Sequence, residues 1–252
     1  RSSSVATILT KNFALYAVAG LMFYLFGYNL MYNDVAASGG FYGIPGPWSV
    51  DDTDALETGY ASASDWFFQM VFVATAASIV SGTVAERIRL WPFLIFSAVL
   101  TSLIYPVVGA WQWGGGWLSE KGFSDFAGSS IVHSVGGWAA LVGALIVGPR
   151  YGRFDSHGRP VLMHASSLPL ATLGTFILWL GWFGFNGGSQ LALGTVDDAI
   201  AISTIVINTN SAAAAGTLTA MLLTQLLYKK VDLTMALNGA LAGLVSITAE
   251  PL

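Results

Sequence analysis

A single histidine lies inside a long uncharged stretch of this chain. The stretch runs from Phe126 to Pro149 and holds His133 well inside it, and its length is sufficient to cross a bilayer as an α-helix. An imidazole is costly to place in hydrocarbon, and ionisable groups there usually mark the path of a proton, an ion or a polar substrate. Because imidazole also titrates near neutral pH, we expect the chemistry of this protein to lie on the helix that carries His133.

Aromatic side chains recur near the expected outer ends of three other apolar stretches. They sit at helical spacings of three and four, with one amide and one hydroxyl among them: Phe68, Gln69, Phe72, Trp113, Trp182, Phe185 and Ser189. Aromatic residues at a membrane boundary are most often interface anchors or packing residues. Their convergence above a buried histidine favours a second interpretation, because each aromatic face attracts a small cation with about 0.5–2 kcal/mol.

The composition excludes an ordinary soluble domain. Hydrophobic residues make up 54% of the 252 residues and charged residues only 10%, which is typical of an all-α polytopic membrane protein. The absence of cysteine excludes disulfides and thiolate metal sites. The sequence also lacks a phosphate-binding loop, metal-ligand spacing and a nucleophile with a base, so we expect no enzyme activity, no cofactor, no metal and no nucleic-acid partner.

The distribution of basic residues indicates how the expected helices are oriented in the membrane. Nine of the ten basic residues fall in alternate loops, and only Lys121 lies on the other side, where most of the acids gather. By the positive-inside rule the basic loops, with the solvated His157 and His164, are cytoplasmic. Seven uncharged runs are each long enough to span a bilayer; they cover about 12–33, 66–85, 90–112, 126–149, 167–190, 199–228 and 233–251.

Small residues predict close packing between the expected helices. They recur on single faces of the runs 126–149 and 199–228, and such faces allow helix backbones to approach where lipid provides no hydrophobic driving force. Asn208, Thr209 and Asn210 lie in the middle of a run, and we expect them to hydrogen-bond between helices. These features predict a tightly packed bundle and indicate nothing about the substrate.

Several motifs occur in a characteristic order along the chain. They are Ala85–Arg89, Trp113–Gly116, Asp125–Gly128 with His133, Gly136–Gly137 and Gly148–Arg150, Gly181–Asn186 with Ser189, Asn208–Thr209, and Gly239–Val245. In order and spacing this set resembles the ammonium transporter (Amt/Mep/Rh) family, in its Amt branch. The resemblance covers essentially the whole chain. It implies the ammonium-transporter fold and an integral protein of the plasma or inner membrane.

The resemblance implies a recruiting site and a gate at the outer side. Phe72, Trp113 and Ser189 match the outer ammonium site of the family, which uses cation–π contacts and a hydroxyl acceptor. Phe72 and Phe185 match the stacked pair of rings that gates the pore, and Phe68 stands beside them in a supporting place. The implied activity is recruitment of ammonium, removal of its proton, and passage of ammonia through a hydrophobic pore lined by histidine.

The same resemblance implies roles inside the pore and in the assembly. His133 matches the first of two pore histidines, Asp125 matches an acid that supports the outer site, and Trp182 is a further supporting residue. Family members form homotrimers with one pore per subunit. Each subunit has eleven helices in a five-plus-five inverted repeat, and many members are regulated by a cytoplasmic PII signalling protein.

The chain departs from the family pattern at its ends. Residues 1–252 are expected to form one transmembrane domain that is an internal fragment, lacking the first helix and the last three, so the second pore histidine would lie beyond Leu252. Glu250 stands where the family pattern suggests a small or thiol residue. We expect it to be an external-end residue that faces protein or water; the alternative is a pore-lining acid within a membrane span.

Three other interpretations fit parts of the pattern. An Amt-like ammonium sensor would carry a signalling domain beyond Leu252. A Rh-type ammonia channel shares the fold but does not usually keep the pair Trp113 and Ser189. A seven-helix photoreceptor would need a lysine within the last span, whereas Lys229 and Lys230 lie at a loop.

Overall fold

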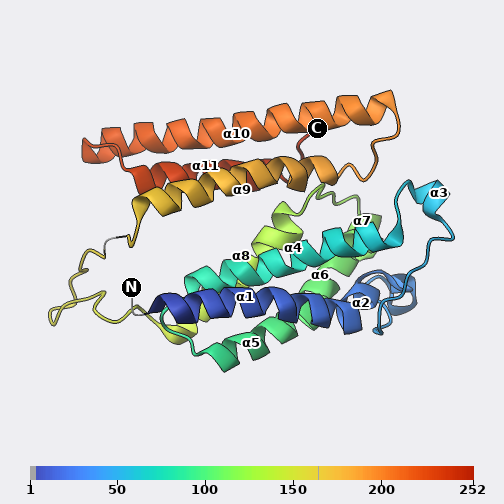
Figure 1. Ribbon diagram of the computed structural model, residues 1–252, viewed down its shortest axis with the longest axis horizontal. Helices are drawn as coiled ribbons and strands as arrows, with labels where there is room; N and C mark the ends of the chain where they lie inside the picture. The colour runs from blue at the N-terminus through green and yellow to red at the C-terminus, as the bar shows by residue number, and fades with distance from the viewer. Residues whose placement is uncertain (1–3, 164) are drawn as a thin grey trace. The chain divides into compact units, whose positions relative to one another are not determined.

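A computed structural model describes residues 4–163 and 165–252, and these are mostly helical (Figure 1). Arg1 and His164, both predicted to be cytoplasmic, lie outside the described residues. The α-helices are α1 Val5–Met22, α2 Tyr28–Tyr32, α3 Ala55–Thr58, α4 Ser62–Thr83, α5 Leu90–Val99, α6 Tyr105–Gln112, α7 Trp117–Glu120, α8 Val135–Val147, α9 Leu168–Gly188, α10 Val196–Tyr228 and α11 Leu233–Ile247. Between them lie π-helical turns, which are wider than the α-helix, at η2 Phe23–Gly27, η4 Leu100–Ile104 and η5 Ser129–Ser134, and a tighter 3-10 turn at η3 Val35–Ser38.

Six of the seven predicted spans are confirmed among the described residues. Helical segments long and apolar enough to cross a membrane cover Val5–Tyr32, Ser62–Thr83, Leu90–Glu120, Ser129–Val147, Leu168–Gly188 and Val196–Tyr228. The seventh, predicted at 233–251, is a shorter apolar helix of 15 residues that ends at Ile247. At 1.5 Å per residue it is about 22 Å long, less than the hydrocarbon thickness of about 30 Å. Glu250 follows its end and is exposed.

The described chain divides into two compact units. Unit 1 comprises Arg1–Thr53, Ala61–Ser124 and Ser130–Ser166, and unit 2 comprises Asp54–Tyr60, Asp125–Ser129 and Ser167–Leu252. Unit 1 therefore holds α1, α2 and α4 to α8, whereas unit 2 holds α3 and α9 to α11.

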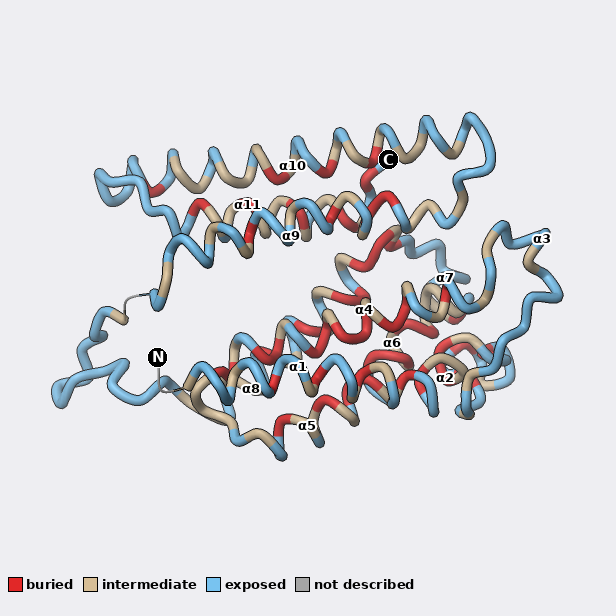
Figure 2. The backbone as a smooth tube through the Cα atoms, in the orientation of Figure 1, coloured by how far each residue is buried: buried red, intermediate tan, exposed pale blue. Residues whose placement is uncertain are grey.

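Helix α4 is the centre of unit 1. It packs against α1 and α8 and carries buried residues along its whole length (Figure 2). The core around it is built from small and branched residues: Leu15, Ala19, Ala74, Ala77, Val80, Val84, Phe93, Leu100 and Ala140. Gly136 of α8 faces the Ala76 carbonyl and Ile79 of α4 so closely that a Cβ there would clash. The predicted close approach of small-residue faces is thus confirmed for these two helices.

Lys11 corrects the predicted start of the first span. The sequence placed it in the loop before residue 12, but α1 begins at Val5 and Lys11 is 3% exposed within the helix. Its Nζ donates to the Ser81 carbonyl at 2.7 Å and lies 4.7 Å from the centroid of the Phe93 ring. A buried ammonium needs such partners to compensate for its lost hydration, and these partners come from residues distant in sequence.

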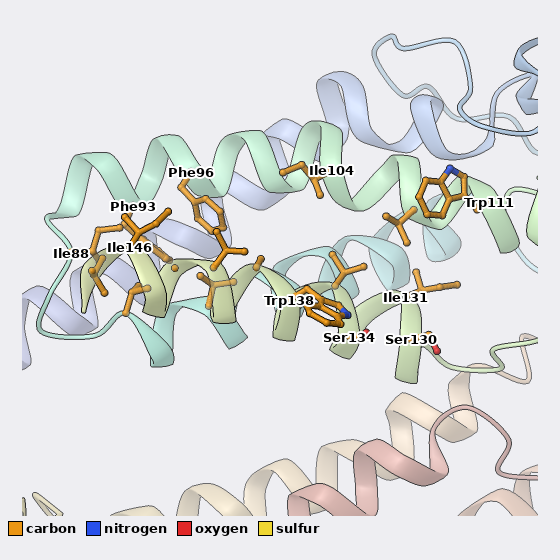
Figure 3. A pocket seen from close by; sticks show the side chains of 18 of the residues that line it. Ile88, Phe93, Phe96, Ile104, Trp111, Ser130, Ile131, Ser134, Trp138 and Ile146 are labelled. Carbon is orange, nitrogen blue, oxygen red and sulfur yellow. The ribbon is translucent and has the colours of Figure 1, made fainter. Parts of the chain in front are cut away.

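An apolar groove of about 720 Å³ runs along α8 in unit 1 (Figure 3). Side chains from α5 and η4, such as Phe93, Phe96 and Ile104, face Ile131, Trp138 and other residues of η5 and α8 across it. Its lining is almost wholly hydrocarbon, with hydroxyls only at Ser130 and Ser134. None of the residues predicted to recruit ammonium lines it.

Glycine contacts hold α10 and α11 together in unit 2. Gly216 and Gly239 face each other across the two helices, and Gly243 faces the backbone of Ala212. A Cβ at Gly239 would lie 2.7 Å from the Ala220 Cβ and 3.0 Å from the Gly216 carbonyl carbon. These contacts involve one turn of α11, from Gly239 to Gly243, and they confirm the close packing predicted for the small residues of the run 199–228.

Replacing Gly239 by alanine should therefore destabilise unit 2. Because the Gly216 backbone cannot move away, the added methyl forces the helices apart, which costs about 1–3 kcal/mol, and we expect the apparent Tm of the detergent-purified protein to fall by several degrees. Gly174→Ala in α9 is the matched control, since no atom lies within 4 Å of its added Cβ. Equal melting of Gly239→Ala and Gly174→Ala would contradict this account of the helix contact.

Candidate functional site

Three aromatic rings form a continuous surface in unit 1. The Phe68 and Phe72 rings lie one turn apart on α4 with centroids 4.6 Å apart, and the Phe72 and Trp113 centroids are 5.8 Å apart. Phe72 is 2% exposed. The predicted shared face of Phe68 and Phe72 is therefore confirmed, and Trp113 from the end of α6 joins it.

The glycines after Trp113 position this ring. Helix α6 ends at Gln112, and Gly114 and Gly116 turn the chain so tightly that a Cβ at either position would clash with backbone, at Met31 and Gly40 respectively. The Gly116 N–H donates to the Ala110 carbonyl at 3.0 Å. Only glycine permits so close an approach, so the motif Trp113–Gly116 fixes the indole beside α4.

A buried acceptor lies next to the aromatic surface. Gln69 is 6% exposed, its amide hydrogen-bonds the Asp65 carboxylate, and its Oε1 accepts no hydrogen bond from the described residues. The Tyr28 hydroxyl donates to Asp65 at 2.7 Å. The predicted span 66–85 left Asp65 in the loop on the side opposite the basic loops, but it is buried in the first turn of α4. Asp65 precedes Gln69 by four residues and Phe72 by seven. This helical spacing was the signal that could have placed the Asp65 carboxylate on the same face of the helix as Gln69.

His133 lies in a π-helical turn that leads into α8. The turn η5 covers Ser129–Ser134, and His133 is partly buried there. Three residues later Gly136 contacts Ala76, which is one turn beyond Phe72 on α4. A π-helical turn is wider than an α-helical one and often occurs at functional sites. The histidine is thus held on a helix that packs tightly against the helix of the aromatic surface.

Asp125 caps the start of this π-helical turn. Its carboxylate is 1% exposed, and Oδ1 accepts from the N–H groups of Gly128 and Ser129, both at 2.9 Å. The adjoining Phe126 and Ala127 donate to carbonyls that follow α11. Asp125 therefore has a structural role in ordering residues 125–129, as an N-terminal capping carboxylate does.

Unit 2 holds the second aromatic pair. The Trp182 and Phe185 centroids are 5.4 Å apart, and Trp182 is 8% exposed. Its Nε1 donates to the Thr248 hydroxyl at 2.8 Å. That hydroxyl lies 3.2 Å from the Asn186 Oδ1, and the Asn186 Nδ2 donates to Thr209 at 3.0 Å. The chain of hydrogen bonds ties α9 to α10 and α11, and it confirms the interhelical role predicted for Thr209.

Ser189 presents an oxygen with free acceptor capacity at the end of α9. Its hydroxyl donates to the Phe185 carbonyl at 2.9 Å. A hydroxyl has one hydrogen and two lone pairs, so the bond within the helix consumes the donor and leaves the oxygen as an acceptor. This electronic arrangement suits a ligand that brings its own N–H groups.

The predicted residues fall into two sets. Phe68, Phe72, Trp113 and His133 belong to unit 1, and the structure brings the first three into contact. Asp125, Trp182, Phe185 and Ser189 belong to unit 2, where Trp182 contacts Phe185 and Ser189 bonds to its backbone. Among the described residues, no cluster of three metal-ligating side chains occurs.

Comparison with known proteins identifies the family. The family model described as the Ammonium Transporter Family matches residues 1–251. The chain belongs to this family. The predicted resemblance and the predicted fold class are confirmed, and the chain is a multi-pass integral membrane protein.

Similar proteins come from several branches of the family. The chain is 43% identical to ammonium transporter Amt2 of Archaeoglobus fulgidus and 45% identical to a putative ammonium transporter of Synechocystis, covering 99% and 98% of this chain but 53% and 56% of those proteins. It thus spans about half the length of the curated relatives it matches. Among solved structures, a sensor Amt protein superimposes with a TM-score of 0.88 at 37% identity, covering 100% of this chain and 62% of that one. Mep2 of Saccharomyces cerevisiae gives 0.84 at 29% identity, covering 97% of this chain and 55% of that one.

Removing the Asp125 carboxylate should destabilise the protein. Asp125→Ala leaves the buried Gly128 N–H and the half-buried Ser129 N–H without an acceptor, which costs about 1–3 kcal/mol, and we expect a lower apparent Tm in detergent. Asp125→Asn keeps an acceptor oxygen and should lose less. Asp197→Ala, at an exposed position in the first turn of α10, is the control. If Asp125→Ala melts at the wild-type temperature, the capping role is wrong.

Proposed function

We propose that this chain transports ammonium across the membrane. The observation that carries the proposal is the aromatic surface of Phe68, Phe72 and Trp113, in which Phe72 is buried and the other two rings are half-buried, in a chain of the Ammonium Transporter Family. Aromatic faces attract a compact cation, while acceptor oxygens satisfy its N–H groups. Phe72, Trp113 and Ser189 recruit ammonium, and Gln69 Oε1 adds a buried acceptor that has no partner among the described residues.

Ammonium is suited to this path because it can give up its charge. A bare cation entering a medium of low dielectric constant faces an idealised cost of order 20 kcal/mol, which is still several kcal/mol after relaxation. Losing a proton at neutral pH, from a pKa of about 9, costs roughly 3 kcal/mol. The cheaper route is to bind the cation outside, remove the proton and pass neutral ammonia through an apolar pore. Sodium and potassium cannot take this route.

The remaining residues take the roles that follow from this route. Phe72 and Phe185 form the aromatic gate, and His133 accepts a hydrogen bond from the substrate or relays its proton, as an imidazole near neutrality can. Asp125 orders the backbone of residues 125–129, and Trp182 is fixed beside Phe185 by its hydrogen bond to Thr248. A homotrimeric assembly and binding of a cytoplasmic PII protein belong to the same proposal.

A sensor is the second candidate, because the solved structure that superimposes with a TM-score of 0.88 is that of a sensor Amt protein. Such a protein would use the same recruiting residues to control a signalling domain. The coding sequence that follows Leu252 distinguishes the two. A kinase-like or cyclase-like domain supports the sensor, and a further pore histidine followed by a short tail supports the transporter.

Loss of an aromatic face should weaken recruitment. Trp113→Leu and Phe72→Leu each remove a cation–π contact of about 0.5–2 kcal/mol, so we expect the KM for methylammonium uptake by the protein at its full natural length to rise about tenfold. Trp91→Leu on α5, whose side chain is largely exposed, controls for loss of any tryptophan. An unchanged KM in both site variants would remove the recruiting role.

His133 should control what passes the pore. Exchange for alanine removes the only imidazole on η5 and α8, and we expect reduced methylammonium flux or a loss of selectivity over potassium, with no change in the oligomeric state on size-exclusion chromatography. His157→Ala in the exposed loop after α8 serves as the control. Wild-type flux together with wild-type selectivity in His133→Ala would exclude the role.

A further inference from the structure

A second cavity of unit 1 has a different chemistry from the apolar groove. It has a volume of about 520 Å³ and lies where α4 and α8 both end. Three of its seven lining residues are arginines; the lining is Gly82, Thr83, Arg87, Pro149, Arg150, Arg153 and Met163. By the positive-inside rule this end of the helices faces the cytoplasm.

Arg87 is held at the wall of the cavity by the end of α8. Its Nη1 donates to the carbonyl of Gly148, the residue that terminates that helix. Its Nε is buried and donates to no atom of the described residues. A buried guanidinium N–H without an acceptor is costly. The Nη1 atom of Arg87 is therefore fixed by the Gly148 carbonyl, whereas its Nε–H still needs an acceptor.

The other two arginines keep most of their donors available. Arg153 Nη1 donates to the Val161 carbonyl at 2.7 Å, which orders the loop after α8. Arg150 Nε lies 3.8 Å from the Glu86 carboxylate, an ion pair too long for a hydrogen bond. Each guanidinium has five N–H donors. With three arginines and one nearby carboxylate, the cavity has an excess of positive charge.

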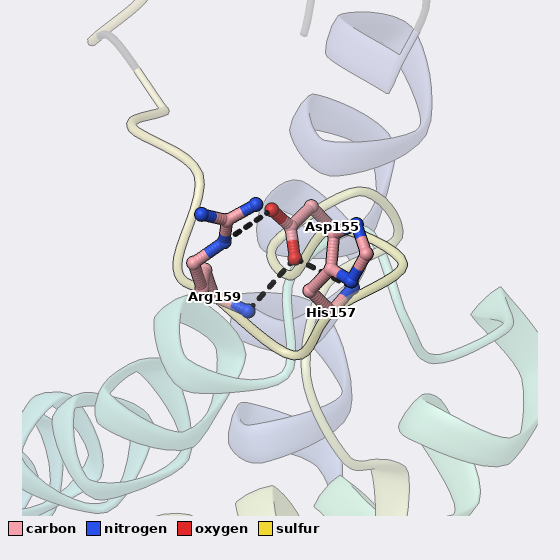
Figure 4. Close-up of polar contacts among 3 residues, drawn as sticks. All are labelled: Asp155, His157 and Arg159. Carbon is pink, nitrogen blue, oxygen red and sulfur yellow. Dashed lines mark hydrogen bonds and ion pairs between the residues drawn. The ribbon is translucent and has the colours of Figure 1, made fainter.

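Arg159 differs from the three arginines of the cavity, because a carboxylate forms a hydrogen-bonded ion pair with it. Arg159 lies on the same loop but does not line the cavity. The Arg159 side chain donates from Nε to Asp155 Oδ2 at 3.1 Å. Asp155 Oδ1 accepts from the backbone N–H groups of Arg159 at 2.9 Å and of His157 at 2.8 Å (Figure 4). These hydrogen bonds, led by that of the Arg159 N–H, hold the pKa of Asp155 below its ordinary value. Arg159 is thus neutralised locally, and Asp155 does not neutralise the cavity.

We propose that the cavity of Arg87, Arg150 and Arg153 binds an anionic phosphate group from the cytoplasmic side. The planar guanidinium fork matches phosphate oxygens in bidentate geometry, and the Thr83 hydroxyl adds a neutral donor. The cavity is within the size range of small-molecule sites, so it admits the phosphate of a lipid headgroup as well as free phosphate. The site does not depend on the transport proposal, because its test needs no flux.

Binding is measured with two probes on the detergent-purified protein at its full natural length. Inorganic phosphate is titrated by calorimetry in chloride buffer of matched ionic strength, and phosphatidylglycerol binding is compared with phosphatidylcholine of the same acyl chains by native mass spectrometry. Arginine-dependent binding of inorganic phosphate assigns the site to free phosphate. Arginine-dependent binding of phosphatidylglycerol alone assigns it to a lipid headgroup.

Three variants decide whether the cavity is the binding site. The pair Arg150→Gln and Arg153→Gln should weaken binding at least tenfold. Gly82→Leu should do the same while keeping every charge, because Gly82 lines the cavity and has open space at its Cβ position; it also decides the matter if the double variant does not fold. Arg159→Gln should stay within twofold of wild type. Absence of binding by both probes, or equal binding by wild type and Gly82→Leu, would overturn the proposal.

Discussion

Hydrocarbon offers no hydrogen-bond partner, so every polar group within a membrane span must be satisfied by the chain itself. The structure obeys this constraint with contacts between distant helices: Lys11 donates to a carbonyl of α4, Tyr28 donates to Asp65, and Trp182 donates to Thr248. Against this background, the oxygen atoms that retain acceptor capacity stand out. Two of them are Gln69 Oε1 and Ser189 Oγ. Gln69 follows Phe68 on α4, and Ser189 lies one turn after Phe185 at the end of α9, so each acceptor comes from a helix that also carries an aromatic ring able to attract a cation.

Helix packing converts this local chemistry into fixed geometry. Glycine at positions 114 and 116 sets the Trp113 ring beside α4, and Gly136 brings the helix of His133 against the same helix. Because no hydrophobic driving force separates protein from lipid, such close backbone contacts and interhelical hydrogen bonds carry much of the stability. The motifs rich in glycine are therefore positioning devices for the aromatic and imidazole groups.

The sequence predicted the helical class, six spans and the aromatic faces, because uncharged length and the 3.6-residue period are local properties. It misplaced Lys11 and Asp65, and it extended the last span beyond Ile247. A charged residue normally indicates a loop. Lys11 and Asp65 can be buried because hydrogen-bond partners from other helices compensate for their lost hydration. The sequence placed Gln69 among the aromatic residues, but it could not predict the unmet acceptor at Oε1, because that depends on which neighbours satisfy the amide.

The central claim is that the chain supports selective movement of ammonium, and flux into liposomes tests it most directly. The protein at its full natural length would be reconstituted, and uptake of labelled methylammonium compared with that of rubidium as a potassium analogue, against liposomes without protein. The account predicts saturable methylammonium uptake that ammonium competes away, with rubidium uptake at the background level. Rubidium uptake equal to that of methylammonium, or no methylammonium uptake above background, would contradict it.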